Sequence, residues 1–287
     1  MFPKISVITP SYNQAQFLEE TIISVIGQQY LNLEYLIIDG GSNDGSVDII
    51  KKYQDKITYW ISEKDSGQAD AINKGFQKAT GEIICWLNSD DLLIPGSLLK
   101  VARYFDHSKE PQLLIGNAFT FKQNTGGGAA SDIRFAHAQY DLRKYDYIIQ
   151  PSTFWNKMVL EKVGRLNEEL HFMLDWEWFI KIQQAGIKIH QVNDYFSLYR
   201  IHENHKSSSK SDRRIEEIFQ VLKDHTSEDY VAFAKKLYLD KNVILKWNKL
   251  FGYPLTNIIN ALLLKILFPK IFLSRNRHYA FRLIEMF

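Results

Sequence analysis

An apolar run that ends in two adjacent carboxylates is the feature of this chain with the clearest chemical use. Residues 83–87 are apolar, and the sequence Asn-Ser-Asp-Asp follows directly at 88–91. A buried strand more commonly ends in a turn built from Gly, Pro, Asn or Ser. Neighbouring carboxylates repel each other unless a cation or hydrogen-bond donors offset the charge, and a divalent metal carrying a diphosphate would do so. The alternative is an acidic turn that caps a helix after Pro95.

The composition is that of a globular protein, 45% hydrophobic and 14% aromatic over 287 residues. Residues 235–287 carry ten Lys or Arg against two acids, a net +8, which leaves 25 basic against 31 acidic residues, a net −6, in 1–234. The single cysteine, Cys85, lies in the apolar run and is expected to be a buried thiol, as in a reducing compartment. We expect no signal peptide, no membrane span of roughly 18–20 residues, and a cytoplasmic protein.

Strand and helix patterns alternate over the first 120 residues. Strands are predicted at 5–9, 35–38, 57–61 and 82–87, and helices at 16–29, 46–53 and 69–79. Strands separated by helices in this way imply βαβ units and a parallel sheet, whose strands end at one common edge. Three of the four loops expected at that edge contain acids, so the edge should collect cations.

The remainder of the chain is more varied. Helices are predicted at 97–105, 158–163 and 174–185, strands at 113–121 and 150–155, one or two strands at 187–198, and a mobile glycine-rich loop at 125–130. Beyond His202 the pattern is helical. We therefore expect an α/β domain over residues 1–209 and a helical, basic extension over residues 210–287.

A series of motifs in this chain resembles the family 2 glycosyltransferases of the GT-A fold. The motifs lie at 9–13, 39–45, 66–75, 88–91, 150–154 and 175–178, and the resemblance covers roughly residues 3–207. Each motif is weak evidence by itself, but their order is specific. The resemblance implies a Rossmann-like, mostly parallel sheet flanked by helices. It also implies a nucleotide-diphosphate sugar donor, with a UDP-sugar favoured, and a glycan or lipid-linked acceptor in bacterial surface polysaccharide biosynthesis.

The first motifs are candidates for the donor site. A nucleotide base needs a stacking surface and an acceptor for its ring N–H, and Tyr12 and Asp39 lie at adjacent strand ends. In the family, the acid at the Asp39 position holds the base. The residues assigned to donor-nucleotide binding are Thr9, Pro10, Tyr12, Asp39, Asn88 and Asp90. A partly buried, structural Tyr12 is the alternative, and Asp44 is expected to cap the helix that follows it.

Asp90 and Asp91 match the family's metal motif, whose oxygen ligands suit Mg²⁺ or Mn²⁺. The metal would act as a Lewis acid on the leaving diphosphate. Asn88 replaces the first acid of the commonest motif, which leaves open how Asp90 and Asp91 divide metal and ribose contacts. His202, in a segment that closes the site in many relatives, could complete the metal shell or contact phosphate, with Arg200 able to pair with it. A structural histidine is the alternative.

Two further positions depart from the family pattern. Gly40 stands where a second acid often follows Asp39, and Ile72 stands where an arginine is common. Lys74 is a candidate for the phosphate contact that such an arginine would make. The alternative is a structural pair between Asp70 and Lys74, which are four residues apart on a helix.

Inverting transfer needs a base near the acceptor hydroxyl, because an alcohol is a poor nucleophile while it keeps its proton. Asp175 is the candidate, since the aromatic residues beside it would raise its carboxyl pKa by desolvation, and the family places its catalytic acid at this position. Glu177, roughly 200° further around a helix, should face away. Asp175 could instead cap the helix, and the two roles can coexist.

The basic tail at 241–287 could lie on a membrane surface. Its apolar segments with scattered lysines are typical of an interfacial helix that binds anionic lipid, which would place the enzyme peripherally on the inner face of the cell membrane. A helical cap or a homodimer interface is the alternative. Nucleic-acid binding is not expected, because the aromatic residues there lie among aliphatic ones.

Other functions fit less well. A sugar-phosphate nucleotidyltransferase would have a glycine-rich phosphate loop with Arg and Lys after the first strand, and a Rossmann dehydrogenase would have G-x-G-x-x-G there. Residues 10–13 match neither pattern. A non-catalytic module that binds a nucleotide-sugar or a protein partner stays open because of Asn88 and Ile72.

Overall fold

The computed structural model describes residues 2–105, 110–122, 127–130, 141–203, 206, 211–241, 283 and 286–287. The chain divides into two compact units, residues 1–140 with 147–208, and residues 141–146 with 209–287. The basic tail lies outside the described residues, apart from Lys241, Leu283, Met286 and Phe287. So do the first residues of the glycine-rich loop.

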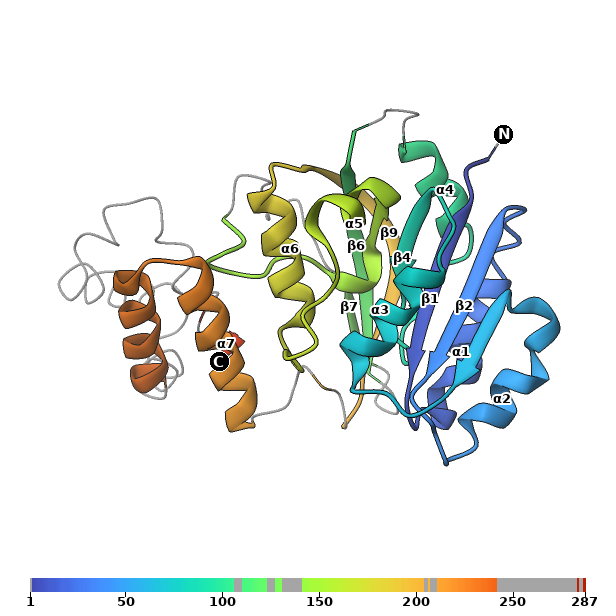
Figure 1. Ribbon diagram of the computed structural model, residues 1–287, viewed down its shortest axis with the longest axis horizontal. Coiled ribbons are helices and arrows are strands. Elements are labelled where there is room, and N and C mark those ends of the chain that lie inside the picture. Colours follow the sequence, from blue (N-terminus) through green and yellow to red (C-terminus); the bar gives the residue numbers. More distant parts are fainter. Residues whose placement is uncertain are drawn as a thin grey trace. The chain divides into compact units, whose positions relative to one another are not determined.

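The first unit is built on a mixed sheet (Figure 1). The strand order among the described residues is β3-β2-β1-β4-β8-β6-β9-β5, with β7 paired to β6. The strands are β1 (Ile5–Ser11), β2 (Leu33–Asp39), β3 (Tyr59–Ser62), β4 (Ile83–Trp86), β5 (Leu92–Leu93), β6 (Gln112–Lys122), β7 (Gly128–Ala130), β8 (Thr153–Asn156) and β9 (Lys188–Ile201). The helices are α1 (Ala15–Ile26), α2 (Ser46–Lys52), α3 (Gln68–Lys78), α4 (Ser97–Tyr104), α5 (Lys157–Val163) and α6 (Leu174–Gln184).

One half of the sheet is parallel, as predicted. Strands β3, β2, β1 and β4 pair in parallel, with Ser11 in register with Asp39 and Asp39 in register with Ser62. The other half is mixed, because β8 is antiparallel to both β4 and β6 while β9 is parallel to β6. The alternation of strands and helices on which the parallel prediction rests ends before β6. The expected loops after β1 to β4 therefore share one edge of the sheet.

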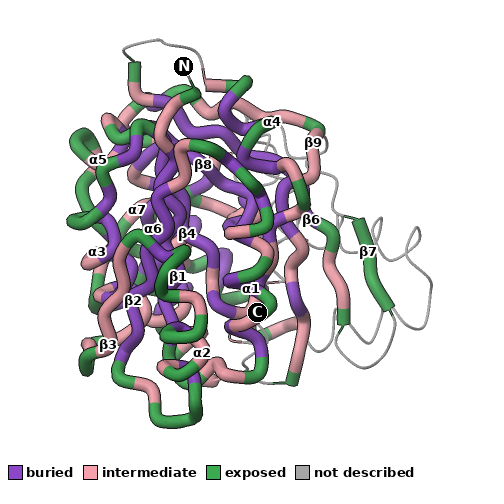
Figure 2. Tube along the Cα trace, turned by 90° about the vertical axis from the view of Figure 1, so that its right-hand side faces the viewer, coloured by how far each residue is buried: buried purple, intermediate pink, exposed green. Residues whose placement is uncertain are grey.

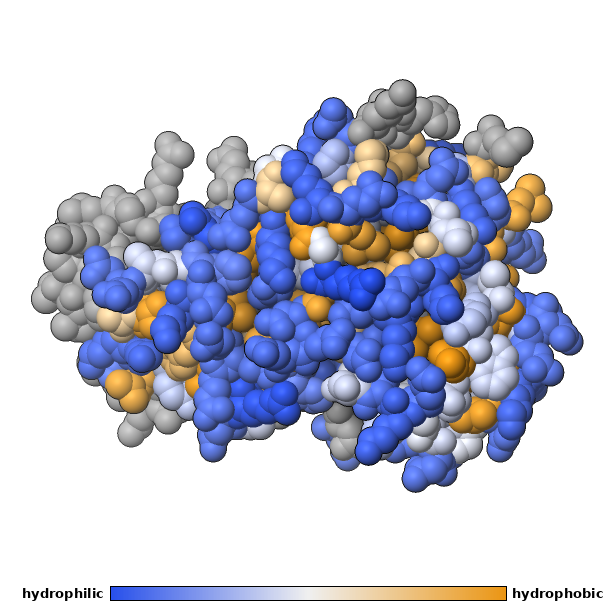
Figure 3. Space-filling model, in the orientation of Figure 1, coloured by the Kyte–Doolittle hydropathy of each residue, from blue (hydrophilic) through white to orange (hydrophobic). Residues whose placement is uncertain are grey.

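The core of the sheet unit is an aromatic cluster between β4, β8, α3 and α6. The ring centroids of Trp86 on β4 and Trp155 on β8 are 5.3 Å apart, and the rings of Phe76 and Trp178 pack against both. A Cβ atom added at Gly75 would come within 2.3 Å of Ile8, so α3 lies directly on β1. Figure 2 shows buried residues concentrated in these central strands. In the view of Figure 3, the sheet unit is largely hydrophilic outside, with hydrophobic residues visible between polar ones.

Two local predictions are refined by the structure, and a third is confirmed. Residues Gln150–Ser152 form a 3₁₀ turn, and the strand begins only at Thr153, because Pro151 has no N–H to donate to a sheet. The segment predicted as one or two strands is the single strand β9, whose register with β6 shifts between Ile115 and Ala118. Cys85 is buried as expected, and burial raises the pKa of its thiol.

The second unit is helical where it is described. Helix α7 (Asp212–His225) begins after Ser211, whose side chain accepts a hydrogen bond from the backbone N–H of Arg214. Residues 228–241 are also helical. Within the described residues, none of the helices combines the length and the apolar sequence that crossing a membrane requires.

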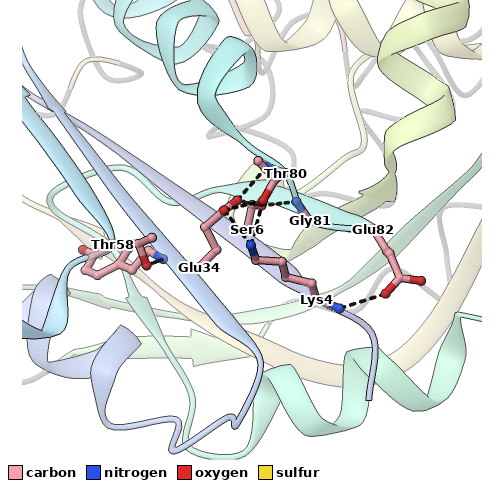
Figure 4. Close-up of polar contacts among 8 residues, drawn as sticks. Lys4, Ser6, Glu34, Thr58, Thr80, Gly81 and Glu82 are labelled. Atoms are coloured by element: carbon pink, nitrogen blue, oxygen red, sulfur yellow. Dashed lines mark hydrogen bonds and ion pairs between the residues drawn. The ribbon is translucent and has the colours of Figure 1, made fainter. Parts of the chain in front are cut away.

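A buried carboxylate ties the strands together at the sheet edge opposite the predicted site. Glu34, at the start of β2, accepts hydrogen bonds from the hydroxyl of Ser6 and from Thr80, and Lys4 lies 3.0 Å from it (Figure 4). Burial by itself would raise the pKa of Glu34, but these donors outweigh burial and lower the pKa to about 2. The backbone N–H of Gly81 donates to Ser6 and extends the network.

We expect Glu34→Gln to lower the free energy of unfolding by about 2 kcal/mol at neutral pH, because the new amide group cannot accept all the hydrogen bonds that the carboxylate accepts. The pKa of Glu34 in the folded protein lies below its ordinary value of 4.5, so its contribution is complete above that pH and is lost as the pH falls towards 2. Urea unfolding of both proteins over this range measures the difference. Glu161→Gln, at an exposed carboxylate on α5, is the control, and an equal loss in both variants would contradict the prediction.

Candidate functional site

The loop that follows β4 is fixed by hydrogen bonds from α1. The hydroxyl of Thr21 donates to the carbonyl oxygens of Ser89, at 2.9 Å, and Asp91, at 2.8 Å. Thr21, Ser89 and Asp91 are all buried. Buried carbonyl groups need such partners, so the conformation of the acidic loop is set by the helix beneath it.

Asn88 is held between two glutamine side chains. Gln68, the first residue of α3, donates from Nε2 to Oδ1 of Asn88 at 2.8 Å, and Asn88 donates from Nδ2 to Oε1 of Gln150 at 3.2 Å. Gln150 in turn donates to the carbonyl oxygen of Trp86 at 2.9 Å. The amide that replaces the first acid of the motif is thus an ordered part of the site.

The two acids of the motif lie in different surroundings. Asp91 is buried, and its Oδ1 accepts a hydrogen bond from the backbone N–H of Arg200 at 3.1 Å. Burial, followed by the nearby charge of Asp90, raises the pKa of Asp91 well above its ordinary range, against the opposing effect of Arg200. Asp90 points the other way, with Oδ2 3.1 Å from Nε2 of His202.

Arg200 supports the loop from β9. Its Nε donates to the carbonyl oxygen of Asp90 at 2.8 Å, and its Nη2 pairs with Glu20 at 2.5 Å. The guanidinium lies 4.9 Å from the ring of Phe17 and 4.8 Å from the ring of Phe121. Because the group is buried and bonded in this way, Arg200 is a structural support, and the expectation that it assists His202 in binding phosphate does not hold.

The predicted metal set is therefore divided by the structure. Asp90 and His202, 112 residues apart in sequence, are brought together with 19% and 8% of their side chains exposed. Asp91 turns away from them. Among the described residues, no group of three or more His, Cys, Asp or Glu side chains is arranged to hold a metal. Asp90 and His202 could supply two ligands, an oxygen and a nitrogen that suit Mn²⁺, and leave the other positions to diphosphate oxygens and water.

Asp39 is committed to the loop that follows β2. Its Oδ2 accepts hydrogen bonds from the backbone N–H groups of Gly41 and Ser42, at 3.1 and 2.9 Å, and from the hydroxyl of Ser62 at 2.7 Å. Its Oδ1 accepts from the hydroxyl of Ser42 at 2.6 Å. The side chain is fully buried, so Asp39 holds the ends of β2 and β3 together.

The other predicted nucleotide contacts lie at the end of β1. Thr9 is buried, and its hydroxyl shares a hydrogen bond of 3.2 Å with Tyr35, so its side chain faces the core. Pro10 is buried within the strand. Tyr12 is 61% exposed, contrary to the alternative of a partly buried tyrosine, and offers a ring surface to a ligand. The hydroxyl of Ser11 is buried and has no hydrogen-bond partner among the described residues.

Two charged residues of the neighbouring motifs have structural contacts. Asp44 accepts hydrogen bonds from the backbone N–H of Ala15, at the start of α1, and of Ser46, at the start of α2. The sequence predicts that Asp44 caps only the helix that follows it. In the structure its carboxylate bonds the starts of both α1 and α2. Lys74 pairs with Glu63 at 3.0 Å and with Asp70 at 3.5 Å. The pair with Asp70 is the structural alternative to a phosphate contact that the sequence leaves open.

Asp175 lies in the first turn of α6, which begins one residue earlier, and accepts a hydrogen bond from the backbone N–H of Trp176 at 2.8 Å. Burial raises the pKa of Asp175, although this hydrogen bond and the charge of Lys206 oppose the increase. Glu177 pairs with Lys181 at 2.8 Å.

Lys206 is a site residue that the sequence did not reveal. Its Nζ donates to Oε1 of Gln68 at 2.8 Å, while the other end of the same amide binds Asn88. The charge of Lys206 also acts on Asp175. Hydrogen bonds therefore connect Asn88 through Gln68 to Lys206, and the charge of Lys206 acts on Asp175 without a direct bond to it among the contacts described. No motif marks Lys206 in the sequence, because its role depends on the fold bringing residues 68, 175 and 206 together.

Comparison with known proteins identifies the family. Residues 6–166 match the model of the family described as glycosyl transferase family 2. A GalNAc(5)-diNAcBac-PP-undecaprenol beta-1,3-glucosyltransferase of Campylobacter jejuni is 27% identical over 207 residues, which are 69% of this chain and 65% of the relative.

Two solved structures share the fold. TarS 1–349 of S. aureus, in complex with UDP-GlcNAc, superposes with a TM-score of 0.63 and 21% identity over 76% of this chain and 64% of that one, just under two thirds of its length. The mannosyltransferase PcManGT of Pyrobaculum calidifontis, in complex with GDP-Man and Mn²⁺, gives a TM-score of 0.56 and 17% identity over 99% of this chain and 86% of that one. The matched family model covers more than half of the chain, and the chain therefore belongs to glycosyl transferase family 2, with the GT-A fold.

Proposed function

We propose that this glycosyltransferase is a metal-dependent, inverting enzyme that transfers a sugar from a nucleotide-diphosphate donor, with a UDP-sugar favoured. The acceptor is a glycan or a lipid-linked saccharide of surface polysaccharide biosynthesis. The observation that carries the proposal is the chain of hydrogen bonds from the acidic loop through Gln68 to Lys206, together with the buried carboxylate of Asp175, on which the charge of Lys206 acts. The complexes of two structural neighbours with nucleotide sugars, and the polyprenol-linked acceptor named for the Campylobacter relative, support it.

The leaving group requires positive charge. Asp90 and His202 would hold a divalent cation, which supplies Lewis-acid stabilisation of the departing nucleotide diphosphate when it is bound. Lys206 adds positive charge from the protein itself, since its ammonium donates to Gln68 and its charge acts on Asp175. Asp91 acts through the loop, because its carboxylate faces the backbone of Arg200.

Asp175 is the proposed base. It removes the proton of the acceptor hydroxyl as that oxygen forms a bond to the anomeric carbon, while the bond from this carbon to the diphosphate oxygen breaks. The nucleotide diphosphate leaves with the electron pair, and the configuration inverts in the single displacement. A carboxylate whose pKa is raised by burial is a stronger base than an exposed one, which suits this proton transfer.

Metal-dependent nucleotide binding tests the first part of the proposal. Titration calorimetry of UDP, GDP and dTDP with and without Mn²⁺ should show tight, Mn²⁺-dependent binding of one of them. Asp90→Asn should weaken this binding by at least about tenfold, since even outer-shell changes at metal sites cost ~10–100-fold. Asp48→Asn, at an exposed carboxylate on α2, is the matched control. Equal Mn²⁺-dependent affinity of wild type and Asp90→Asn would contradict the metal site.

The second prediction concerns the base. Asp175→Asn should lower kcat by about 10²–10⁴-fold, because the amide cannot accept the acceptor's proton. The affinity for the nucleotide measured by calorimetry should stay unchanged, since Asp175 contacts the acceptor side. Turnover at the wild-type rate by the folded variant would remove Asp175 from the mechanism.

The pH profile provides a third prediction. Because the base must be ionised and its pKa is raised, activity should fall as the pH decreases through that raised pKa. Lys206→Met removes a charge that lowers the pKa of Asp175, so the acidic limb of the kcat/KM profile should move to higher pH. Lys181→Met, on α6 and paired with Glu177, is the control and should leave the limb in place. A limb that does not move in Lys206→Met would show that the two groups are not coupled in catalysis.

A further inference from the structure

The acid that the family resemblance assigns to the nucleotide base is already used by the protein. Asp39 is fully buried, and its four hydrogen bonds come from Gly41, Ser42 and Ser62 at the ends of β2 and β3. A carboxylate bonded in this way stabilises the loop, and a base could reach it only by displacing those donors. The next residue, Gly40, has no side chain to take over the contact.

The carboxylate of Asp65 occupies the space beside Gly40. Asp65 lies in the loop after β3, one strand further along the sheet. A Cβ atom added at Gly40 would lie 2.6 Å from Oδ2 of Asp65 and 3.1 Å from its Oδ1. The adjoining backbone is also close, since a Cβ atom at Gly41 would lie 3.3 Å from the backbone nitrogen of Lys64. The loop after β3 thus delivers a carboxylate to the position where a side chain of residue 40 would begin.

Asp65 also keeps the hydrogen-bonding capacity that Asp39 has lost. Its Oδ1 accepts one hydrogen bond, from the backbone N–H of Gly67 at 2.9 Å, and no other described residue donates to its carboxylate. Burial raises the pKa of Asp65, and the charges of Asp70 and Asp39 add to the increase, against the effects of Gly67 and Lys74. A partly buried carboxylate with one donor gains stability when a ligand brings a second.

We infer that Asp65, and not Asp39, accepts the ring N–H of the donor's base. The inference rests on the proposed nucleotide-sugar donor, and it selects among bases. Uracil and thymine carry an N–H at N3 and guanine carries one at N1, whereas cytosine and adenine present an acceptor at the equivalent edge. The exposed ring of Tyr12, at the end of β1 in the same row of strand ends, supplies the stacking surface. The site therefore takes UDP, dTDP or GDP and rejects CDP and ADP.

Calorimetry with Mn²⁺ and a pair of nucleotides tests the inference. Wild type should bind UDP about 10- to 100-fold more tightly than N3-methyl-UDP, which lacks the N–H donor to the carboxylate. Asp65→Asn should bind UDP more weakly and should discriminate less between UDP and N3-methyl-UDP, because a neutral amide oxygen is a weaker acceptor for the ring N–H than a carboxylate. Its preference for UDP over CDP should also fall, because an amide can donate to N3 of cytosine. Glu63→Gln, two residues away and half exposed, is the matched control and should behave as wild type.

Gly40→Ala provides a variant that keeps every acid. The new methyl group would meet Oδ2 of Asp65 and displace that carboxylate, so UDP affinity should fall while Asp39 and its bonds remain. Thermal unfolding and circular dichroism confirm that each variant folds. If Asp65→Asn does not fold, the comparison of UDP with N3-methyl-UDP on wild type, together with Gly40→Ala, still decides.

The outcomes separate this inference from the proposed function. Equal affinity of wild type for UDP and N3-methyl-UDP, or a folded Asp65→Asn that keeps the affinity and the discrimination of wild type, overturns the role of Asp65 and leaves the donor site standing. If GDP or dTDP is the nucleotide that binds, its N-methylated analogue takes the place of N3-methyl-UDP. Failure of wild type to bind any of the three nucleotides with Mn²⁺ overturns the donor site and the role of Asp65 with it.

Discussion

Repulsion between two adjacent carboxylates is the constraint around which this site is arranged. Asp90 and Asp91 follow a buried strand, and the structure separates them by turning one inwards and one outwards. The inward acid needs a donor, which the backbone of Arg200 supplies, and the same residue's side chain fixes the carbonyl of Asp90. Burying charged groups such as the Asp91 carboxylate and the Arg200 guanidinium raises the free energy of the folded state unless their partners are well placed. The stacking of Arg200 between Phe17 and Phe121 provides that placement and joins α1, β6 and β9 to the acidic loop.

Both edges of the parallel half-sheet have a buried structural carboxylate, and the carboxyl edge also has acids with fewer hydrogen-bond donors. Glu34, at the amino ends of the strands, is surrounded by donors and lowers the free energy of the folded state. Asp39, at the carboxyl ends, likewise holds two loops. Asp65, Asp90 and Asp175 have fewer donors than these structural acids. Groups that the protein leaves incompletely bonded are the ones available to a ligand, and open α/β sheets gather them at the carboxyl edge.

The sequence was sufficient for the elements whose evidence is local. The first four strands and three helices follow from hydrophobic periodicity and turn residues, and the parallel pairing follows from their alternation. The antiparallel entry of β8 was not predictable, because strand pairing depends on contacts between distant segments. At the site, Asp90 and His202 were named from the motifs, whereas the inward turn of Asp91 and the contact of Lys206 with Gln68 depend on side-chain directions that no spacing encodes.

Two of the three departures from the family pattern, Asn88 and Gly40, are explained by contacts between segments that are distant in sequence. Asn88 donates to Gln150 and accepts from Gln68, which an aspartate at that position could not do, and a third carboxylate beside Asp90 and Asp91 would increase the repulsion there. Gly40 removes an acid but makes room for Asp65 from the neighbouring loop. The negative charge at this edge therefore depends on the acids of several loops together. A motif that loses an acid can keep its chemistry when a neighbouring strand end brings another carboxylate to the same place.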